Sequence, residues 1–340
     1  MEKYRQQEFI SRVLDGRTAS GSLNGWGAAP VNIALCKYWG KRDADLNLPL
    51  TSSLSVSLGD LGSKTSIQLR DDDSGDRVFL DDVEMDSNSS FARRISGFLD
   101  LFRPEFGGLL SFDVRTENSV PTGAGLASSA SGFAALVLAL DDLADWALDR
   151  KRLSMLARLG SGSASRSLFD GFVRWNAGED EMGVDSFAEP LPYRWESLRV
   201  GILEVSKKPK AVSSREGMNR TSEHSILFKS WPDQVNRDLA RIEQAIAEKD
   251  FKLLGETAEN NALAMHATMM AAWPPLCYWE PKTLKQVQRV WAARKDGLPV
   301  YLTMDAGPNI KLLFLEENRD GVEAFFPGFK MIAPFASEAG

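Results

Sequence analysis

The sequence contains few of the residues that build disulfide bonds or zinc sites. In 340 residues there are two cysteines, Cys36 and Cys277, and two histidines, His224 and His266. They are far apart along the chain, so their spacing predicts no zinc site, and the low cysteine content is typical of a reducing cytoplasm. A chain of this length can bury a core that is stable without either kind of crosslink.

Long apolar runs and an excess of positive charge are also lacking. No stretch reaches the ~18 apolar residues that a membrane span requires, and the start of the chain lacks the apolar core of a secretion signal. The formal net charge is −7, which argues against a nucleic-acid partner, because binding to a phosphate backbone normally requires a basic face. We therefore expect a cytoplasmic protein that binds neither membranes nor nucleic acids.

The order of apolar and alternating segments predicts an α+β fold rather than a regularly wound parallel sheet. Strands are expected at 28–39, 53–58, 65–69, 78–80, 111–115, 167–175, 199–205, 300–304 and 311–315. Helices are expected at 91–102, 126–148, 153–159, 239–254 and 283–294. The second of these helices carries no charge before Asp141, which indicates a buried central helix.

An acidic stretch rich in turn-forming residues, 176–198, suggests a domain boundary. We predict a short polar N-terminal extension at 1–27, a first domain at 28–190 and a second domain at 191–340.

A loop of small residues at 121–131 (PTGAGLASSAS) leads directly into the apolar helix. Gly123 and Gly125 allow the backbone to approach an anion, and the free N–H groups and dipole at a helix start favour negative charge. The hydroxyl groups of Ser128 and Ser129 can contact a phosphate or Mg²⁺. A tight turn that only permits close helix packing explains the same residues equally well, and the loop lacks the lysine of a Walker motif.

Two basic segments follow predicted strands. Lys37, Lys41 and Arg42 fall within six positions, and lysine suits phosphate as a point charge. The second segment, 206–218, can form a basic loop that closes over a polyphosphate and excludes water. Both segments can also be solvated loops in which Lys41 and Arg42 pair with nearby acids. Lys37 fits that explanation less well, because a cysteine and a tyrosine flank it.

Two further residues are candidates for chemistry. Arg166 follows a run of glycine and serine, and its guanidinium group can bind a carboxylate or phosphate in a bidentate manner, although a linker between helix and strand is the simpler explanation. Asp305 begins an Asp-Ala-Gly-Pro-Asn turn between two apolar strands, where an aspartate most often caps the turn. Its position at a strand end also suits a base that acts on a hydroxyl group.

In this order, the segments resemble the diphosphomevalonate decarboxylase family, which belongs to the superfamily of galactokinase, homoserine kinase and mevalonate kinase. The resemblance covers roughly residues 28 to 316, and the conjunction is far more specific than any single motif. Beside the glycine-serine loop, the matching segments are 29–34 (APVNIA), 37–43 (KYWGKRD), 46–49 (LNLP), 52–56 (SSLSV), 161–166, 213–218 (SSREGM), 265–268 (MHAT), 274–275 and 305–309 (DAGPN).

The resemblance implies a two-domain small-molecule kinase fold of the GHMP type. Its sheets are mixed, helices cover one face, and the active site lies in the cleft between the domains. The implied reaction is ATP-dependent decarboxylation of 5-diphosphomevalonate to isopentenyl diphosphate, through transient phosphorylation of the 3-hydroxyl group, with Mg²⁺ and a homodimeric enzyme.

The resemblance also implies roles for individual residues. The residues implied in catalysis are Asp305 and Lys37 at the hydroxyl group, with Arg166 and Asn32 at the substrate carboxylate. The residues implied in binding the substrate diphosphate are Tyr38, Lys41, Arg94, Ser161, Ser163 and Arg215. The residues implied on the ATP side are Gly123, Gly125, Ser87, Asn88, Lys207, Lys208, Lys210 and Ser214, with Ser128 and Ser129 also near Mg²⁺.

Three alternatives stay open at this point. A kinase of the same fold would stop at the 3-phosphate, and another decarboxylase would prefer the 5-monophosphate. A catalytically inactive homologue would only bind ligands. The departures from the family pattern, Gly123, Ser165 and Asp170, leave the catalytic group unchanged.

Overall fold

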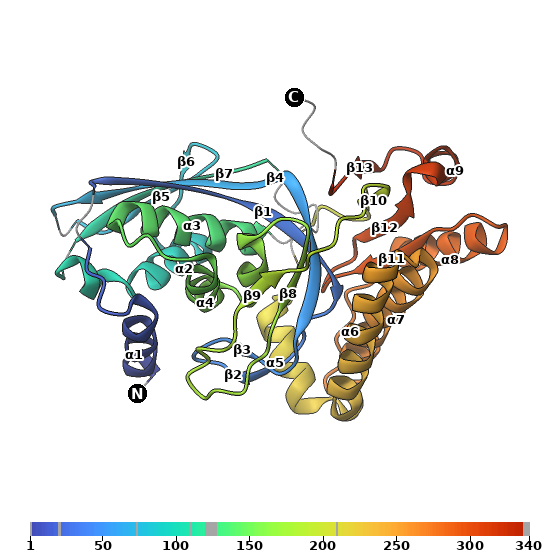
Figure 1. Cartoon of the computed structure of the whole chain (residues 1–340), viewed down its shortest axis with the longest axis horizontal. Coiled ribbons are helices and arrows are strands. Elements are labelled where there is room, and N and C mark those ends of the chain that lie inside the picture. Colours follow the sequence, from blue (N-terminus) through green and yellow to red (C-terminus); the bar gives the residue numbers. More distant parts are fainter. Residues whose placement is uncertain are drawn as a thin grey trace.

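The computed structural model describes residues 2–19, 22–72, 74–108, 110–119, 128–208 and 210–335. In this part of the chain, strands and helices form two halves that lie side by side along the long axis of the molecule (Figure 1). Each half has its own sheet and helices, which confirms the predicted α+β class.

A mixed sheet of seven described strands forms the N-terminal half, in the order β6-β5-β7-β4-β8-β9, with β1 also paired to β4. The strands are β1 (Asn24–Cys36), β4 (Ser53–Arg70), β5 (Arg77–Leu80), β6 (Val83–Glu84), β7 (Ser111–Asn118), β8 (Phe172–Trp175) and β9 (Ala188–Pro190). The two short strands predicted at 53–58 and 65–69 are one strand, β4. It continues because β8 and β7 pair with its two ends while β1 pairs along both.

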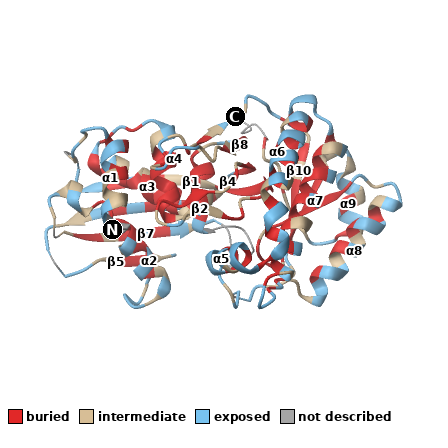
Figure 2. Ribbon diagram, turned by 90° about the horizontal axis from the view of Figure 1, so that it is seen from below, coloured by how far each residue is buried: buried red, intermediate tan, exposed pale blue. Residues whose placement is uncertain are grey.

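Helices cover one face of this sheet (Figure 1). They are α1 (Glu2–Leu14), α2 (Ser90–Leu99), α3 (Ser128–Ala144) and α4 (Arg150–Gly160). The largely buried helix α3 packs against β1 and β4, as predicted from its apolar sequence (Figure 2). Gly27 of β1 permits this contact, because a Cβ atom there would lie 2.4 Å from the carbonyl oxygen of Ala135.

The C-terminal half contains a four-stranded antiparallel sheet in the order β11-β12-β10-β13. Its strands are β10 (Leu198–Leu203), β11 (Tyr301–Met304), β12 (Ile310–Leu315) and β13 (Lys330–Ile332). Its helices are α5 (Ser214–His224), α6 (Trp231–Glu248), α7 (Phe251–Met270), α8 (Pro281–Lys295) and α9 (Arg319–Phe325). None of the helices described in either half combines the length and apolar character that crossing a bilayer requires.

Short elements connect these parts. They are the hairpin of β2 (Lys41–Asp43) and β3 (Leu48–Pro49) and the 3-10 helices η1 (Arg103–Phe106), η2 (Gly162–Leu168), η3 (Ile226–Ser230) and η4 (Glu316–Asn318). The strand predicted at 167–175 is therefore only partly correct, because its first residues belong to η2 and β8 begins at Phe172.

The single helix predicted at 239–254 is wrong, because the chain breaks there into α6 and α7. Lys249 ends α6 in the left-handed conformation, with φ of 54°. The carboxylate of Asp250 then accepts a hydrogen bond from the backbone N–H of Leu253 and caps α7. An N-cap and a left-handed residue in succession turn the chain without glycine or proline.

The segment before residue 28, which we expected as a polar extension, forms α1 and the first part of β1. Four side chains of α1 are buried in the core of the N-terminal half: Phe9, Ile10, Val13 and Leu14. On its polar side, Arg5 donates to the carboxylate of Asp43 at 2.7 Å. This helix is therefore an integral part of the N-terminal half and touches the β2–β3 hairpin.

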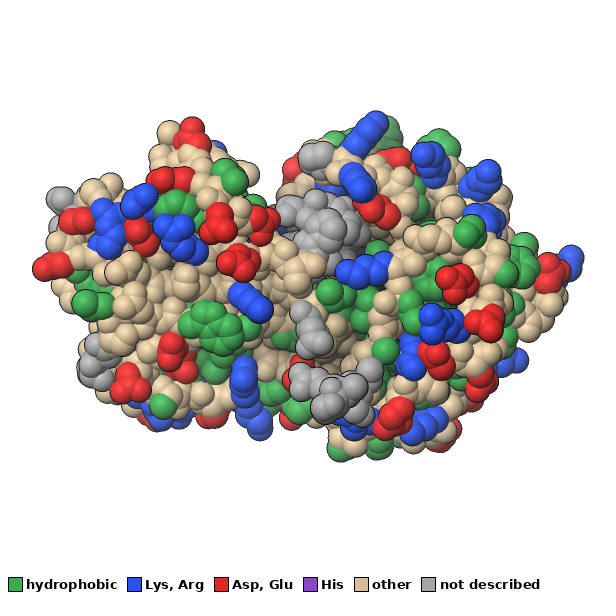
Figure 3. Space-filling model, turned by 90° about the horizontal axis from the view of Figure 1, so that it is seen from above, with side chains coloured by type: hydrophobic (Ala, Val, Ile, Leu, Met, Phe, Trp, Pro, Cys, Tyr) green, Lys and Arg blue, Asp and Glu red, His purple; other side chains and the backbone are tan. Residues whose placement is uncertain are grey.

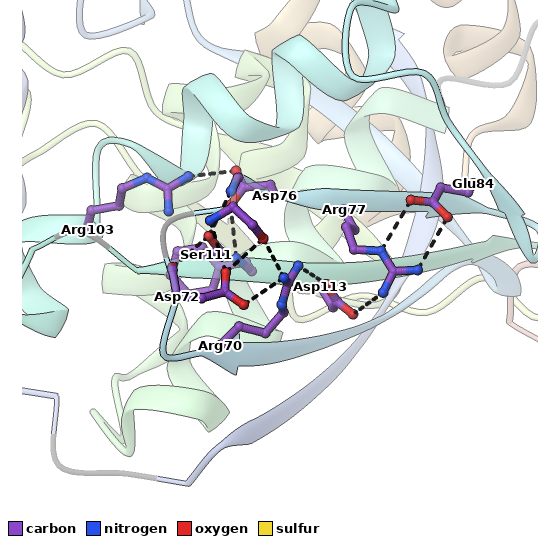
Figure 4. A network of polar contacts seen from close by, with 11 residues as sticks. Arg70, Asp72, Asp76, Arg77, Glu84, Arg103, Ser111 and Asp113 are labelled. Atoms are coloured by element: carbon purple, nitrogen blue, oxygen red, sulfur yellow. Dashed lines mark hydrogen bonds and ion pairs between the residues drawn. The ribbon is translucent and has the colours of Figure 1, made fainter.

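A network of ion pairs fixes the far edge of the N-terminal sheet (Figure 4). Arg103 donates to the carboxylate of Asp76 at 2.6 Å, and the other oxygen of that carboxylate accepts from the backbone N–H of Phe112. Arg70 joins Asp72 and Asp113 in the same network. These contacts hold the connection between β4 and β5 against β7, and none of these residues lines the cavity described below.

We predict that α1 contributes strongly to stability. Phe9 is fully buried, so Phe9→Ala is expected to lower the free energy of unfolding by about 3–5 kcal/mol through lost contacts and a cavity. The matched control is Tyr4→Ala on the same helix, where the ring is 76% exposed and the expected change is within about 0.5 kcal/mol. Urea unfolding measures both, and equal stabilities of the two variants would contradict the packing of α1.

Candidate active site

A cavity of about 710 Å³ lies between the two halves and is lined by residues of both. Lys and Arg side chains lie on either side of the boundary between the halves (Figure 3). The predicted site residues that line the cavity are Asn32, Lys37, Tyr38, Lys41, Arg94, Ser129, Ser161, Ser163, Arg166, Lys208, Lys210, Ser214, Arg215 and Asp305. The fold thus brings together residues that are up to 273 positions apart, from Asn32 to Asp305.

Asp305 lies directly after β11, at the start of the turn to β12. Its Oδ1 accepts from the Nζ of Lys37 at 2.9 Å, and its Oδ2 accepts from the Nζ of Lys311, also at 2.9 Å. The lysine side chains are 2% and 1% exposed, whereas that of Asp305 is 31% exposed. The carboxylate therefore faces the cavity with both of its oxygens bound to buried ammonium groups, which is a different arrangement from a turn cap.

The charges of this cluster are set by burial and by one another. Burial alone would raise the pKa of Asp305, but Lys311 and Lys37 outweigh it and hold that pKa far below its usual range. Burial lowers the pKa of Lys37 to about 8, with Asp305 opposing this shift. Burial also lowers the pKa of His266 to about 3, so its ring is neutral, and its Nε2 lies 3.1 Å from the carbonyl oxygen of Asp305.

The backbone around Lys37 is held by two buried polar side chains. The N–H of Lys37 donates to the amide oxygen of Asn261 at 2.8 Å, and the amide nitrogen of Asn261 donates to Asp238 at 2.8 Å. Asn261 lies on α7 and Asp238 on α6, and both are fully buried. The Nζ of Lys37 also donates to the carbonyl oxygen of Ala34. Helices of the C-terminal half therefore fix a residue of the N-terminal half.

Arg166 of η2 is buried beside Asn32 of β1. Its guanidinium group donates to the hydroxyl oxygen of Ser53 at 2.6 Å and to the amide oxygen of Asn32 at 3.4 Å. The amide nitrogen of Asn32 donates to the hydroxyl oxygen of Ser167, which fixes its orientation. Burial lowers the pKa of Arg166 to about 10, and its Nε has no partner among the described residues. A buried cation with neutral neighbours is suited to a small anion.

A second basic group in the same cavity consists of Lys41, Arg94 and Arg215. Burial, with the charges of Arg215 and Arg94, lowers the pKa of Lys41 to about 8. Burial, with the charge of Arg215, lowers the pKa of Arg94 to about 10. Within the described residues, no acid pairs with any of the three. Three cations that repel one another are suited to an anion of high charge, such as a diphosphate.

The alternative in which Lys41 and Arg42 pair with nearby acids is not what the structure shows. Arg42 donates to the carbonyl oxygens of Ala177 and Asp180. The neighbouring acid, Asp43, pairs with Arg5 of α1. Lys41 therefore remains directed to the cavity.

Tyr38, Ser161 and Ser163 lie beside this basic group. The ring of Tyr38 packs edge-to-face on Trp175, with 4.9 Å between ring centroids, and its buried hydroxyl group has no partner among the described residues. The hydroxyl oxygens of Ser161 and Ser163 are 3.3 Å apart. Gly162 lies between them because a Cβ atom there would come within 2.7 Å of the Tyr38 ring.

The structure describes only some of the residues that are predicted to bind the nucleotide. Ser129 lines the main cavity and also an adjoining one of about 150 Å³, which is lined by Phe91 and Phe133 as well. Gly123, Gly125 and the side chain of Ser128 lie outside the described residues.

Three other residues predicted for the nucleotide lie outside both cavities. Ser87 and Asn88 are exposed in the turn before α2, and Lys207 is 82% exposed. Lys210, which does line the main cavity, donates to the hydroxyl oxygen of Ser214 at 3.3 Å. The roles of all these residues stay predictions.

Three residues of the site were missed by reasoning from the sequence. The pattern around Lys311 predicts an apolar strand, and a lysine within such a strand is itself a signal of a buried partner. His266 lies in a segment that matches the family, but the sequence indicates no role for it. Asn309 accepts from the backbone N–H groups of residues 205 and 206, so it attaches the Asp305 turn to the basic loop.

Two family models match most of the chain. Residues 29–188 match the diphosphomevalonate decarboxylase-like N-terminal domain, and residues 200–335 match the mevalonate 5-diphosphate decarboxylase C-terminal domain. The predicted site residues from Asn32 to Arg166 fall in the first match, and those from Lys207 to Asp305 fall in the second.

Individual relatives agree with the family models. A diphosphomevalonate decarboxylase of Aspergillus fumigatus is 40% identical over 312 residues, which are 86% of this chain and 77% of that protein. The structure of mevalonate diphosphate decarboxylase from Staphylococcus aureus matches with a TM-score of 0.86 at 36% identity, over 92% of this chain and 96% of that chain. The structure of MDDEF in complex with MVAPP, AMPPCP and magnesium matches with a TM-score of 0.86 at 40% identity, over 92% and 98% of the two chains.

We predict that the second basic group binds pyrophosphate more weakly as the pH rises through 8. Lys41 has a pKa of about 8, so most of its positive charge is lost above that pH. If binding depends on this one proton, the affinity is expected to fall about tenfold for each pH unit above 8. Isothermal titration calorimetry with inorganic pyrophosphate measures the dependence. In Lys41→Arg the cation keeps its proton, so the fall in affinity should disappear and only the titration of pyrophosphate itself should remain. A fall that persists in that variant would assign the proton to another group.

Proposed function

The chain belongs to the diphosphomevalonate decarboxylase family, and we propose that it uses ATP to convert 5-diphosphomevalonate into isopentenyl diphosphate. The other products are ADP, phosphate and carbon dioxide. This reaction belongs to the mevalonate pathway of isoprenoid biosynthesis. One observation carries the proposal for these residues: one cavity contains a carboxylate between two lysines, a buried arginine without an acid partner among the described residues, and a separate group of three cations.

Asp305 is the residue that orients the tertiary hydroxyl group of the substrate. Its side chain faces the cavity, and its low pKa keeps it ionised as a hydrogen-bond acceptor. The hydroxyl oxygen forms a bond to the γ-phosphorus of ATP while the bond from that phosphorus to the bridging oxygen of ADP breaks. The ammonium group of Lys37, 2.9 Å from Asp305, opposes the negative charge that develops during this transfer.

Arg166 and Asn32 hold the carboxylate of the substrate. Once the hydroxyl group is phosphorylated, the C3–O bond breaks and phosphate leaves with the electron pair. The electron pair of the C1–C2 bond then forms the double bond between C2 and C3, and carbon dioxide is released. Because Arg166 is fixed by Ser53 and Asn32, it can hold the carboxylate in one orientation through both steps.

Lys41, Arg94 and Arg215 bind the diphosphate end of the substrate, together with Tyr38, Ser161 and Ser163. The number of cations supports the diphosphate over the monophosphate, because a diphosphate carries more negative charge and more oxygens to compensate three cations that have no acid partner among the described residues. Arg215 lies on α5, which is largely exposed at the boundary between the halves (Figure 2).

The residues present fit ATP with Mg²⁺. A relative binds AMPPCP and magnesium, and within the described residues no group of three or more His, Cys, Asp or Glu could hold a metal ion. This fits Mg²⁺, which keeps several waters and binds mainly to substrate phosphates, where it neutralises phosphate charge. Ser129, with Ser128, would hold the metal-bound phosphates, and Lys208 and Lys210 would cover them from the basic loop.

Three broader expectations remain part of this proposal. The division into domains at 28–190 and 191–340 is supported by the two separate family matches. We also propose a homodimer, as the family resemblance implies, and a cytoplasmic location, in line with the composition of the chain. Sedimentation velocity tests the homodimer.

We predict that Asp305→Asn binds both substrates but turns them over slower by a factor on the order of 10³ or more, because an interaction used in the transition state is lost. Steady-state kinetics and calorimetry measure the two properties separately. Asp320→Asn, an exposed acid on α9, serves as the control and should retain full activity. Near-normal turnover of a pure Asp305→Asn preparation would remove the role assigned to Asp305.

The choice of substrate requires a separate experiment. Mevalonate, its 5-phosphate and its 5-diphosphate are each incubated with Mg²⁺ and ATP, and ADP and carbon dioxide are measured independently. We expect both products in equal amounts from the 5-diphosphate, and little of either from the other two. ADP without carbon dioxide would indicate a kinase, activity with the monophosphate would indicate a different specificity, and failure to bind ATP would indicate an inactive homologue.

A further inference from the structure

Lys311 is a buried lysine in the middle of the C-terminal sheet. It lies on β12 between β11 and β10, where it pairs with Thr303 and Ile202. Its neighbours on the strand, Ile310 and Leu312, point into the core under this sheet, so the alternation of a strand directs Lys311 to the opposite face, toward the cavity. Its side chain is only 1% exposed.

A buried lysine at this position destabilises the fold unless its charge is compensated. Removing an ammonium group from water carries a desolvation penalty that its ion pair must offset, and an apolar residue would match the other residues of β12, which are all apolar. Asp305 already has a partner in Lys37 at 2.9 Å. The second lysine therefore exceeds what neutralising one carboxylate requires, and it adds a positive charge where an anionic substrate would bind.

We propose that Lys311 is a positioning residue for the reaction: it fixes the Asp305 carboxylate from the side opposite Lys37 and keeps it ionised and correctly oriented toward the acceptor hydroxyl group. Lys311 and Asp305 are joined by the short turn between β11 and β12, so the pair belongs to one rigid hairpin. Lys37 comes from the other half of the molecule. The carboxylate is thus held from two independent elements, which leaves it a single orientation.

This arrangement has a consequence for the proton of the substrate. Because both oxygens of Asp305 accept hydrogen bonds from ammonium groups, the carboxylate is a weak base, and the hydroxyl group keeps its proton until the bond to phosphorus is well formed. Loose phosphoryl transfer has this property, because the attacking oxygen gains charge late. Asp305 then orients the hydroxyl group first and takes up its proton only as the transfer is completed.

The groups that face Asp305 determine how the variants should respond to pH. They are Lys37 after β1, Arg166 of η2, Lys210 of the basic loop, His266 of α7 and Lys311 of β12. Among them, Lys311 and Lys37 lower the pKa of Asp305, and Lys311 also lowers the pKa of Lys37. Loss of the charge at 311 should therefore raise the pKa of both partners.

The test uses Lys311→Met, which keeps the aliphatic volume, and Lys311→Gln, which keeps an N–H donor without charge. In both variants we expect kcat to fall on the order of 10²-fold, as for a misplaced catalytic group, with KM changed by less than about threefold. The alkaline limb of the pH profile of kcat, which reports the loss of the proton of Lys37, should move to higher pH. Lys330→Met is the matched control, because Lys330 pairs with the same Ile202 from β13 and is exposed.

A double-mutant cycle with Asp305→Asn separates this inference from the function on which it rests. If Lys311 acts through Asp305, Lys311→Met should cost little more in an Asp305→Asn background. A folded Lys311 variant with the kcat and pH profile of the unmodified protein overturns the inference. An equal loss of kcat in both backgrounds, or a fall in kcat with an unmoved alkaline limb, overturns it too. If Lys311→Met does not fold, the Gln variant decides by the same readouts. Full activity of Asp305→Asn, in contrast, would refute the function proposed for Asp305 itself.

Discussion

The ion pair between Lys37 and Asp305 joins the two halves of the molecule at the point where the chemistry takes place. Lys37 directly follows β1, which pairs with β4 in the N-terminal sheet, and Asp305 begins a turn of the C-terminal sheet. Asp305 also pairs with Lys311 of its own half, whereas Lys37 finds its acid partner only on the other half. Asn261 on α7 reinforces the contact by binding the backbone of Lys37. The site is therefore complete only when the two halves are docked, because a buried Lys37 without Asp305 would be an uncompensated charge.

The distribution of charge also explains how an acidic protein can bind highly charged anions. The chain has a net charge of −7, yet its cavity contains Lys41, Arg94, Arg166 and Arg215 with Asp305 as the acid lining it among the described residues. The negative surface disfavours long polyanions, which would have to cover much of it, whereas a small phosphate compound can enter the cavity. Selectivity for small ligands follows from this separation of surface and interior.

Much of the site could be predicted from the sequence, because each basic or acidic candidate lay in a short segment that is characteristic of the family. The sequence alone did not show which faces of distant helices and strands contact one another. Lys311 lies in a strand that reads as apolar, and its importance depends on the direction of one side chain relative to Asp305. The break between α6 and α7 was missed for a similar reason, since Lys249 and Asp250 end one helix and begin the next without glycine or proline. In α1, the polar composition concealed four apolar residues that share one face.

The helix α1 lies before residue 29, where the family match begins, and yet it is built into the core and reaches the hairpin that presents Lys41. The boundary of sequence similarity is thus not the boundary of the cooperative unit in this protein. A truncated variant that begins at residue 29 would expose the apolar surface that Phe9 and its neighbours cover. It would also leave Asp43 without its ion-pair partner, Arg5. Its solubility and its affinity for phosphates would then describe a damaged fragment, so this protein should be compared with its relatives with the helix retained.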